Sequence, residues 1–419
     1  MLIDYAGNCW FTTGFGIYRT QNLSGTPAQW VAQMDNLEEL VVNIIKAPPV
    51  AGGAALISGT ADMIGFVHAD YDSVPRSTLM PDQFGYGSSI AYCESKPSVV
   101  AFVGSDQSNG IGKAQYSLDN GKTWSNFATT PAGAFNGNIA ISATDPKRMV
   151  WAPTAADWTS PAKITAYYTT DGGNKWTICT GLPAVNDASL QWSTSQFLTS
   201  DKVNGNTFYY YDPGFWPAPT GVVYRSIDGG VSWSQVKTGL PQFYRMKLES
   251  VPGKQGHVWF STHSNDALHI SKDSGSTWEA VDSVHSISFG FGKAIAPSTE
   301  PTAFLYGTIS GKTGMFRSTD YGRTWTAIGI NVLPDNITDI TGDMRNAGRV
   351  LVGTSGRGIF RGEDLLIGTS IFSGSTFKKT DRSKLFISNS GKIPMVNSNR
   401  NIRPLHVYEI RGRLLSARP

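Results

Sequence analysis

The sequence predicts an all-β protein: a seven-bladed β-propeller with a small C-terminal β tail. Three observations support this fold class. The 419 residues are rich in glycine (45) and aromatic residues (11%) but poor in charge (16%), which is typical of compact, turn-rich β proteins. The pattern S/T-x-D-x-G-x-x-W recurs five times along the chain. Short alternating or aromatic segments surround each copy, as expected for β-strands.

Each copy of this pattern, an Asp box, has a simple structural interpretation. The carboxylate can accept backbone N–H bonds in a tight turn, the glycine adopts a conformation that other residues resist, and the tryptophan packs in the core. The spacings of 52, 57, 45 and 47 residues each hold about four strands, which fits a propeller blade. We therefore expect structural (BNR-type) repeats rather than calcium sites. The box aspartates are Asp119, Asp171, Asp228, Asp273 and Asp320.

Two weaker copies extend the series upstream to seven. One ends in Trp30, and the other is centred on Asp72 and has lost its tryptophan. Residues 9–20 and 349–362 read alike, so both could supply the middle strands of a closing blade. Only one segment can occupy that place, and we expect the other to be loosely attached or paired with a further propeller.

The order of strands predicts which loops lie together. In a four-stranded meander, the box joins the third strand to the fourth, so the loop between the second and third strands emerges on the opposite face. These opposite-face loops carry Asp62 and a set of polar and aromatic residues that we predict to bind substrate in a polysaccharide-type cleft. The set is Asp106, Trp158, Phe215, Trp216, His263 and Asp266.

The aromatic members of this set leave two interpretations open. Trp158 and Trp216 lie in the proline-rich loops "TAADWTSPA" and "DPGFWPAPTG". A flat exposed ring can stack on the apolar face of a pyranose. The same ring can instead pack inside its own loop, and the sequence does not distinguish the two.

Several classes of chemistry are excluded by the sequence. It contains no H-E-x-x-H, Walker or G-x-S-x-G motif, and its six histidines lack metal-ligand spacing, so we expect no metal and no cofactor. No apolar run approaches the roughly 18 residues of a membrane span. The net charge of +3 combines +8 in residues 371–419 with −5 elsewhere. Because the basic residues are scattered through strand-like text, we expect no nucleic-acid binding. Carboxylates remain, and glycoside hydrolysis needs only two of them.

An ordered set of segments resembles one family. The segment containing "ALISGTADMIGFVHADYD", and later "MKLESVPGKQGHVWFST" and "GFGKAIAP", is similar in sequence and order to the C-terminal propeller of glycoside hydrolase family 74, the xyloglucanases. The similarity runs from about residue 9 to residue 363. It implies tandem propellers with an open cleft that hydrolyse β-1,4-glucan bonds with inversion, each propeller contributing one catalytic aspartate.

The resemblance assigns a role to Asp62. It matches the aspartate that serves as general acid, although Ala61 stands where the family usually has glycine. The resemblance places the partner base in an N-terminal propeller, within a segment that this sequence does not contain. It thus implies the C-terminal part of a xyloglucan hydrolase, with xyloglucan and the N-terminal propeller as partners.

The remaining expectations concern boundaries and location. We expect a propeller over residues 1–365 and a basic tail over 366–419, which is either an accessory β module or, as "VYEIRGRLL" suggests by resemblance, a secretion sorting domain. Either favours a secreted or cell-surface protein whose signal peptide lies with a missing N-terminal half.

The sequence leaves two alternative functions to compare with this one. A non-catalytic glycan-binding propeller would keep the cleft wall without the chemistry. A sialidase would need an arginine triad and a Tyr/Glu pair, and the usual F/Y-R-I-P start is missing.

Overall fold

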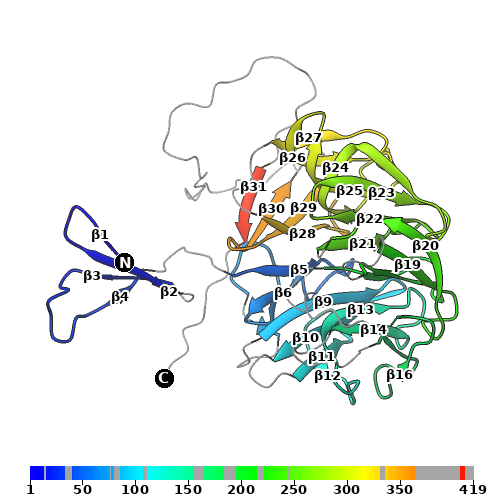
Figure 1. Ribbon diagram of the computed structural model, residues 1–419, viewed down its shortest axis with the longest axis horizontal. Helices are drawn as coiled ribbons and strands as arrows, with labels where there is room; N and C mark the ends of the chain where they lie inside the picture. The colour runs from blue at the N-terminus through cyan, green and yellow to red at the C-terminus, as the bar shows by residue number, and fades with distance from the viewer. Residues whose placement is uncertain are drawn as a thin grey trace, which may run out of the picture.

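A computed structural model describes most of the chain. The described residues are 1–13, 16–33, 40–75, 77–79, 85–106, 111–154, 165–183, 195–214, 221–243, 245–330, 336–363 and 406–410. Within them, every regular element is a β-strand, which confirms the all-β prediction. Figure 1 shows the strands from β5 onward gathered in one rounded body, with a small sheet set apart from it at the N-terminus.

The N-terminal sheet consists of four antiparallel strands in sequence order, and the pairs recorded for these strands are all within it. Phe11, Tyr18 and Trp30 form an aromatic cluster, with Phe11 4.6 Å from Trp30 and 5.0 Å from Tyr18 between ring centroids. Leu2 and Ile3 remain exposed. The strands are β1 (Leu2–Ile3), β2 (Cys9–Thr13), β3 (Gly16–Thr20) and β4 (Val31–Ala32).

The main body is built from antiparallel meanders that follow one another along the chain. The first two contain β5 (Val42–Lys46), β6 (Leu56–Asp62), β7 (Gly65–His68) and β8 (Ser77–Thr78), then β9 (Gly85–Cys93), β10 (Lys96–Asp106), β11 (Ile111–Ser117) and β12 (Ser125–Asn126). The next two contain β13 (Phe135–Ile141), β14 (Met149–Thr154), β15 (Tyr167–Thr169) and β16 (Thr177–Ile178), then β17 (Leu198–Ser200), β18 (Phe208–Asp212), β19 (Gly221–Ser226) and β20 (Ser234–Leu240).

The later strands continue the pattern, with one long strand shared between two meanders. The first part of β24 pairs with β23 and its second part with β25. The strands are β21 (Met246–Ser250), β22 (Val258–Thr262), β23 (Asp266–Ser271), β24 (Glu279–Gly292), β25 (Thr302–Ile309), β26 (Lys312–Ser318) and β27 (Thr326–Ile330), then β28 (Ile337–Gly342), β29 (Arg349–Thr354), β30 (Ile359–Glu363) and β31 (His406–Ile410). This is a propeller architecture, and the count of seven blades stays a prediction.

Of the two similar segments, 349–362 lies in the main body. Its strands β29 and β30 pair with β28 and with β31, which the chain contributes from the predicted tail. Residues 9–20 form β2 and β3 of the separate sheet instead. The domain boundaries and the role of the tail stay predictions.

Each of the five Asp boxes lies between the third and fourth strands of its meander. In all five, the Ser or Thr hydroxyl contacts the box aspartate, which also accepts the N–H of the residue four positions later. In the box of β19 and β20, the Ser226 hydroxyl contacts an Asp228 oxygen at 2.7 Å, and Asp228 accepts the Ser232 N–H at 3.0 Å. The Trp233 indole N–H donates to Gly230 O at 2.9 Å. The boxes are therefore turn-forming, as the sequence predicted.

The weak box of the first meander is centred on Asp70, which corrects the expectation of Asp72. Asp70 lies two residues after the end of β7, as Asp119 lies two residues after the end of β11. Its carboxylate accepts the N–H groups of Asp72 and Ser73 at 2.8 and 2.7 Å. Asp72 takes the place of the box glycine, and Pro75 that of the tryptophan.

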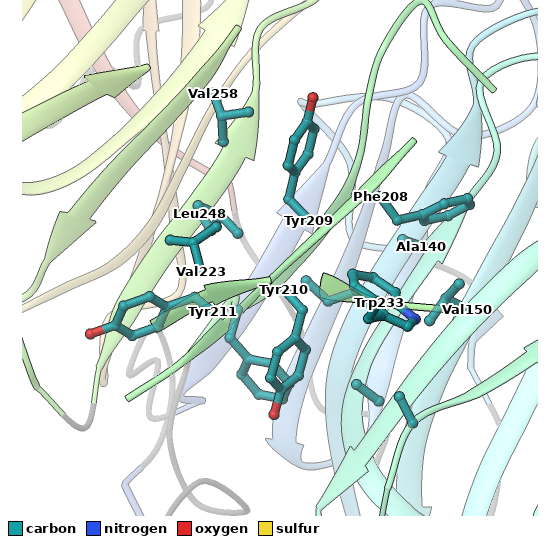
Figure 2. Close-up of a cluster of buried hydrophobic side chains, with 14 of the residues drawn as sticks. Ala140, Val150, Phe208, Tyr209, Tyr210, Tyr211, Val223, Trp233, Leu248 and Val258 are labelled. Carbon is teal, nitrogen blue, oxygen red and sulfur yellow. The ribbon is translucent and has the colours of Figure 1, made fainter. Parts of the chain in front are cut away.

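The core lies between neighbouring meanders, where both sheet faces are apolar. Figure 2 shows four consecutive aromatic residues of β18, 208–211, with Tyr209 and Tyr210 extending to opposite sides of the strand. Tyr210 meets the box tryptophan Trp233 edge-on, with ring centroids 6.4 Å apart. Such double-sided burial is the reason that these strands read as continuous apolar runs rather than as alternating ones.

Buried polar contacts join the first meander to the last. Asp339 on β28 accepts the N–H of Ile45 on β5 at 2.9 Å and pairs with Lys247 at 2.7 Å. Further out, the Tyr71 hydroxyl donates to Asp343 at 2.9 Å. We call this second group, Tyr71 and Asp343 with the arginines around them, the seam cluster; its arginines are Arg345, Arg349 and Arg361.

Two further features concern the described residues only. The three cysteines, Cys9, Cys93 and Cys179, are buried and free. In this part of the chain no helix is long and apolar enough to cross a membrane.

Candidate functional site

Asp62 is the last residue of β6 and immediately precedes the turn into β7. The weak box around Asp70 follows the other end of β7. Asp62 and the boxes therefore lie at opposite ends of the strands, on opposite rims of the propeller. This is the placement that the order of strands predicted.

The Asp62 turn has an unusual backbone. Asp62 and Ile64 have φ values of 67° and 61°, in the region that non-glycine residues rarely adopt. The N–H of Met63 donates to Ala61 O at 2.7 Å, and that of Gly65 to Met63 O at 2.6 Å. Each bond closes a three-residue turn around a residue of positive φ, a strained type of γ-turn. Strained backbone is concentrated at functional sites in proteins, so this turn is a candidate site.

The Asp62 carboxyl is exposed, yet the protein around it partly removes it from water. This desolvation raises the pKa of Asp62 above its ordinary value, as predicted for a general acid. No opposing ion pair is recorded for it within the described residues. A carboxyl with a raised pKa can hold a proton at a pH where an ordinary aspartate is ionised.

A glycine of the next meander supports the turn. Gly85, the first residue of β9, pairs with Asp62 on one side and with Asp106 on the other. This contact joins β6 to β9 and merges the first two meanders into a single eight-stranded sheet. Because neighbouring strands are about 4.8 Å apart, the backbones of Asp62 and Asp106 are about 10 Å apart.

Asp106 is close to Asp62 in the sheet but differs from it in environment. Asp106 is 5% exposed and has an ion-pair partner in Lys113, at 3.9 Å. The register therefore brings together two of the predicted site residues, one exposed and one buried.

His263 lies in the turn between β22 and β23, and Asp266 is the first residue of β23, on the same rim as Asp62. Burial lowers the pKa of His263 to about 4, so its ring is neutral near pH 7. Its Nε2 is 3.1 Å from Thr338 O, which can only accept, so Nε2 carries the proton. Asp266 accepts the hydroxyls of Thr262, at 3.0 Å, and Ser264. Both side chains thus already have local partners.

The three predicted aromatic residues, Trp158, Phe215 and Trp216, lie outside the described residues. Their role as sugar-binding residues stays a prediction.

The structure adds two residues that sequence reasoning missed. Tyr86 pairs with Ala61 in the extension of β6. Burial raises the pKa of Tyr86, with the Arg245 charge acting to lower it and the Asp62 charge to raise it, so all three groups lie near one another. Tyr86 and Arg245 carry no motif, because they are 159 positions apart along the chain and come together only in the folded protein.

No group of three or more potential metal ligands is present among the described residues. The site as described is a carboxyl site.

Comparisons with known proteins agree with this description. A model of the BNR/Asp-box repeat matches residues 115–126. A xyloglucanase of a Paenibacillus species is 33% identical over an alignment of 363 positions, which covers 83% of this chain and 33% of that protein. An oligoxyloglucan-reducing end-specific xyloglucanase of Emericella nidulans is 30% identical over an alignment of 380 positions, which covers 83% of this chain and 44% of that protein.

A solved structure supports the same relation. The GH74 xyloglucanase from Xanthomonas campestris matches with a TM-score of 0.64 and 29% identity, over 85% of this chain and 48% of that one. The fold and its boxes define an Asp-box β-propeller. Within this class, the chain is a homologue of the xyloglucanases of glycoside hydrolase family 74. It spans 33% to 48% of the length of these proteins.

Proposed function

We propose that this chain is the part of an inverting glycoside hydrolase that supplies the general acid, Asp62, for cleavage of β-1,4-glucan bonds in xyloglucan. The observation that carries the proposal is the state of Asp62: an exposed carboxyl with a raised pKa on a strained turn, on the rim opposite the boxes. The names of the homologous proteins indicate the substrate.

The acid step needs the properties that Asp62 has. A glycosidic oxygen leaves as an alcohol only if a proton reaches it as the C–O bond breaks, so the acid must be protonated at the working pH. Desolvation raises the pKa of Asp62 and so favours its protonated form. A bound polysaccharide would displace more water from the carboxyl and raise its pKa further.

The second carboxylate is proposed to come from another propeller. Inversion requires a base about 6.5–9.5 Å from the acid to activate water. Asp106 is buried and paired with Lys113, and Asp266 is held by two hydroxyls. Neither is placed as an open base. The match covers 33% and 48% of the two homologous proteins, so more than half of each lies outside the matched region. That length is enough for a further propeller.

Two finer statements belong to the same proposal. The loops with Trp158 and with Phe215 and Trp216 supply stacking surfaces for the glucan on the Asp62 rim. Because a polysaccharide of this size does not cross membranes, the enzyme acts outside the cell.

Binding by the chain itself tests this proposal. In native gel electrophoresis, we expect xyloglucan in the gel to retard the chain, and galactomannan at equal concentration to leave its mobility unchanged. Asp62→Asn should be retarded like the wild type, because the acid acts on the leaving group rather than on binding. Equal mobility with xyloglucan, galactomannan and no polymer would contradict the proposal.

A further inference from the structure

The Asp62 turn contains a second strained residue, Ile64, to which the proposed function assigns no role. Eight non-glycine residues of the described chain have positive φ, and Ile64 is the β-branched one among them. Asparagine, aspartate, serine and glycine tolerate this region far better than isoleucine does. The corresponding turn between β25 and β26 uses the permissive pair Ser310 and Gly311, with φ values of 51° and 73°.

Ile64 and Asp62 face opposite environments. Asp62 is exposed, whereas Ile64 is 0% exposed and belongs to the core cluster that joins the first two meanders. Together, the two three-residue turns reverse the chain between the antiparallel strands β6 and β7. The burial of one side chain therefore fixes where the other points.

The surroundings leave Ile64 little freedom to move. Its carbonyl accepts the N–H of Thr60 at 2.8 Å. A Cβ added to Gly87 would lie 1.9 Å from the Ile64 carbonyl oxygen, and one added to Gly85 would lie 3.1 Å from Ile64 Cγ1. Gly85 and Gly87 of β9 thus pack directly against the turn and leave no room for a larger side chain.

We propose that Ile64 is a positioning residue: its buried side chain anchors the strained turn and thereby holds the Asp62 carboxyl on the rim in one orientation. The catalytic consequence of this inference rests on the proposed function, but its structural consequence does not. A strained conformation persists only where the surrounding contacts over-determine it. Removal of the anchor should therefore release the turn and hydrate the carboxyl.

The titration of Asp62 measures this directly in the chain as it is. The Asp62 carboxyl carbon, assigned by its loss in Asp62→Asn, is followed by NMR against pH. We expect Ile64→Val, which keeps most of the anchor, to titrate like the wild type. Ile64→Gly should shift the Asp62 pKa toward the ordinary value of about 3.9. Ile64→Ala, which shortens the side chain without freeing the backbone, should shift it in the same direction and serves if the glycine variant does not fold.

A core substitution away from the turn is the matched control. Val100 on β10 is 0% exposed and lies in the same core cluster as Ile64. Val100→Ala should lower the melting temperature and leave the Asp62 titration unchanged. If the Ile64 variants that fold titrate like the wild type, or if Val100→Ala shifts the Asp62 pKa equally, Ile64 is an ordinary core residue and the inference is wrong.

Turnover separates this inference from the proposed function. In an active two-propeller form, Ile64→Gly should lower kcat on the order of 100-fold, the typical effect of an ångström of misplacement, with little change in KM. If Asp62→Asn abolishes turnover and Ile64→Gly keeps full kcat, the proposed function stands and the inference fails. If the Ile64 variants shift the Asp62 pKa while Asp62→Asn keeps full activity, the anchor is real and the proposed function fails.

Discussion

At the scale of single residues, Asp62 shows what a linear pattern can and cannot reveal. Its candidacy followed from a sequence resemblance, and its face of the propeller followed from the order of strands. Its positive φ and its desolvation did not, because they depend on Gly85, 23 positions away along the chain, and on the burial of Ile64. The local sequence identifies Asp62 as a candidate, whereas contacts between neighbouring meanders determine its backbone conformation and its pKa.

The raised pKa of Asp62 makes a prediction about stability. Because the folded state raises this pKa, folding favours the protonated form, and stability falls as the pH rises from the unfolded value of about 3.9 through the folded value. Asp62→Asn should therefore keep the free energy of unfolding at pH 7 within about 0.5 kcal/mol of the wild type, or raise it. Urea unfolding at pH 7 and pH 3.5 checks this, and any gain should vanish at the lower pH.

The control is a box aspartate. Asp119 accepts the Thr123 N–H at 2.9 Å, so Asp119→Asn should cost about 1 kcal/mol. A larger loss for Asp62→Asn than for Asp119→Asn would identify Asp62 as a structural residue of its turn.

At the scale of elements, the boxes were predictable because their contacts are local. Every bond of the Asp228 box joins residues within a few positions of one another. For the first meander, the prediction of Asp72 as the box aspartate was wrong because Asp70 and Asp72 both lie near the expected position of that aspartate. Only the hydrogen bonds to Asp70 decide between them, since Asp72 is turned toward Arg361 at 3.0 Å.

The seam cluster yields a second stability prediction. Asp343 is fully buried and pairs with Arg345 and Arg349, both at 3.2 Å. Asp343→Asn should lower the free energy of unfolding by about 3 kcal/mol, because it removes the charge of a fully buried carboxylate that pairs with two partly buried arginines. The surface pair of Asp145 and Arg148, 3.9 Å apart, supplies the control, and Asp145→Asn should cost less than about 1 kcal/mol.

The contribution of Asp343 to the free energy of unfolding depends on pH with the opposite sign to the contribution of Asp62. Burial tends to raise the pKa of Asp343, but hydrogen bonds from Asn346 and Arg345 and the arginine charges outweigh it and lower the pKa. Its contribution is therefore present above the unfolded value and lost as the pH falls through the folded value. In chemical unfolding, the difference in the free energy of unfolding between the wild type and Asp343→Asn should become smaller below about pH 3.9. If this difference in the free energy of unfolding stayed constant from pH 7 to pH 3, the carboxylate charge of Asp343 would not be what stabilises the seam cluster.

At the scale of the whole molecule, the repeats made the propeller predictable, whereas the fate of individual repeats was not. The sequences of 9–20 and 349–362 are alike, and both form strand pairs. The segment 349–362 lies beside β28, which is joined to β5 through Asp339 in a contact between residues 294 positions apart. A sequence pattern of about 12 residues carries no information about the contact between β5 and β28 that joins the first meander to the last.

The proposed division of the active site predicts the behaviour of the isolated chain. It should bind xyloglucan weakly and release little or no reducing sugar from it, because the acid lacks a base to activate water. A reducing-sugar assay with purified chain checks this, with a complete family 74 xyloglucanase as the positive control. Robust release would require a base within this chain, and Asp106→Asn and Asp266→Asn would then be the variants to compare.

The most direct test of the account is the turnover of Asp62→Asn with two leaving groups. The chain is joined to the preceding propeller of a homologous xyloglucanase and assayed on xyloglucan and on a xyloglucan oligosaccharide with a dinitrophenolate leaving group. On xyloglucan, we predict a loss of kcat of about 10²–10⁴-fold, the usual contribution of acid catalysis. The dinitrophenolate leaves without a proton, so its release should be largely spared. Full activity of Asp62→Asn on natural xyloglucan would contradict the account.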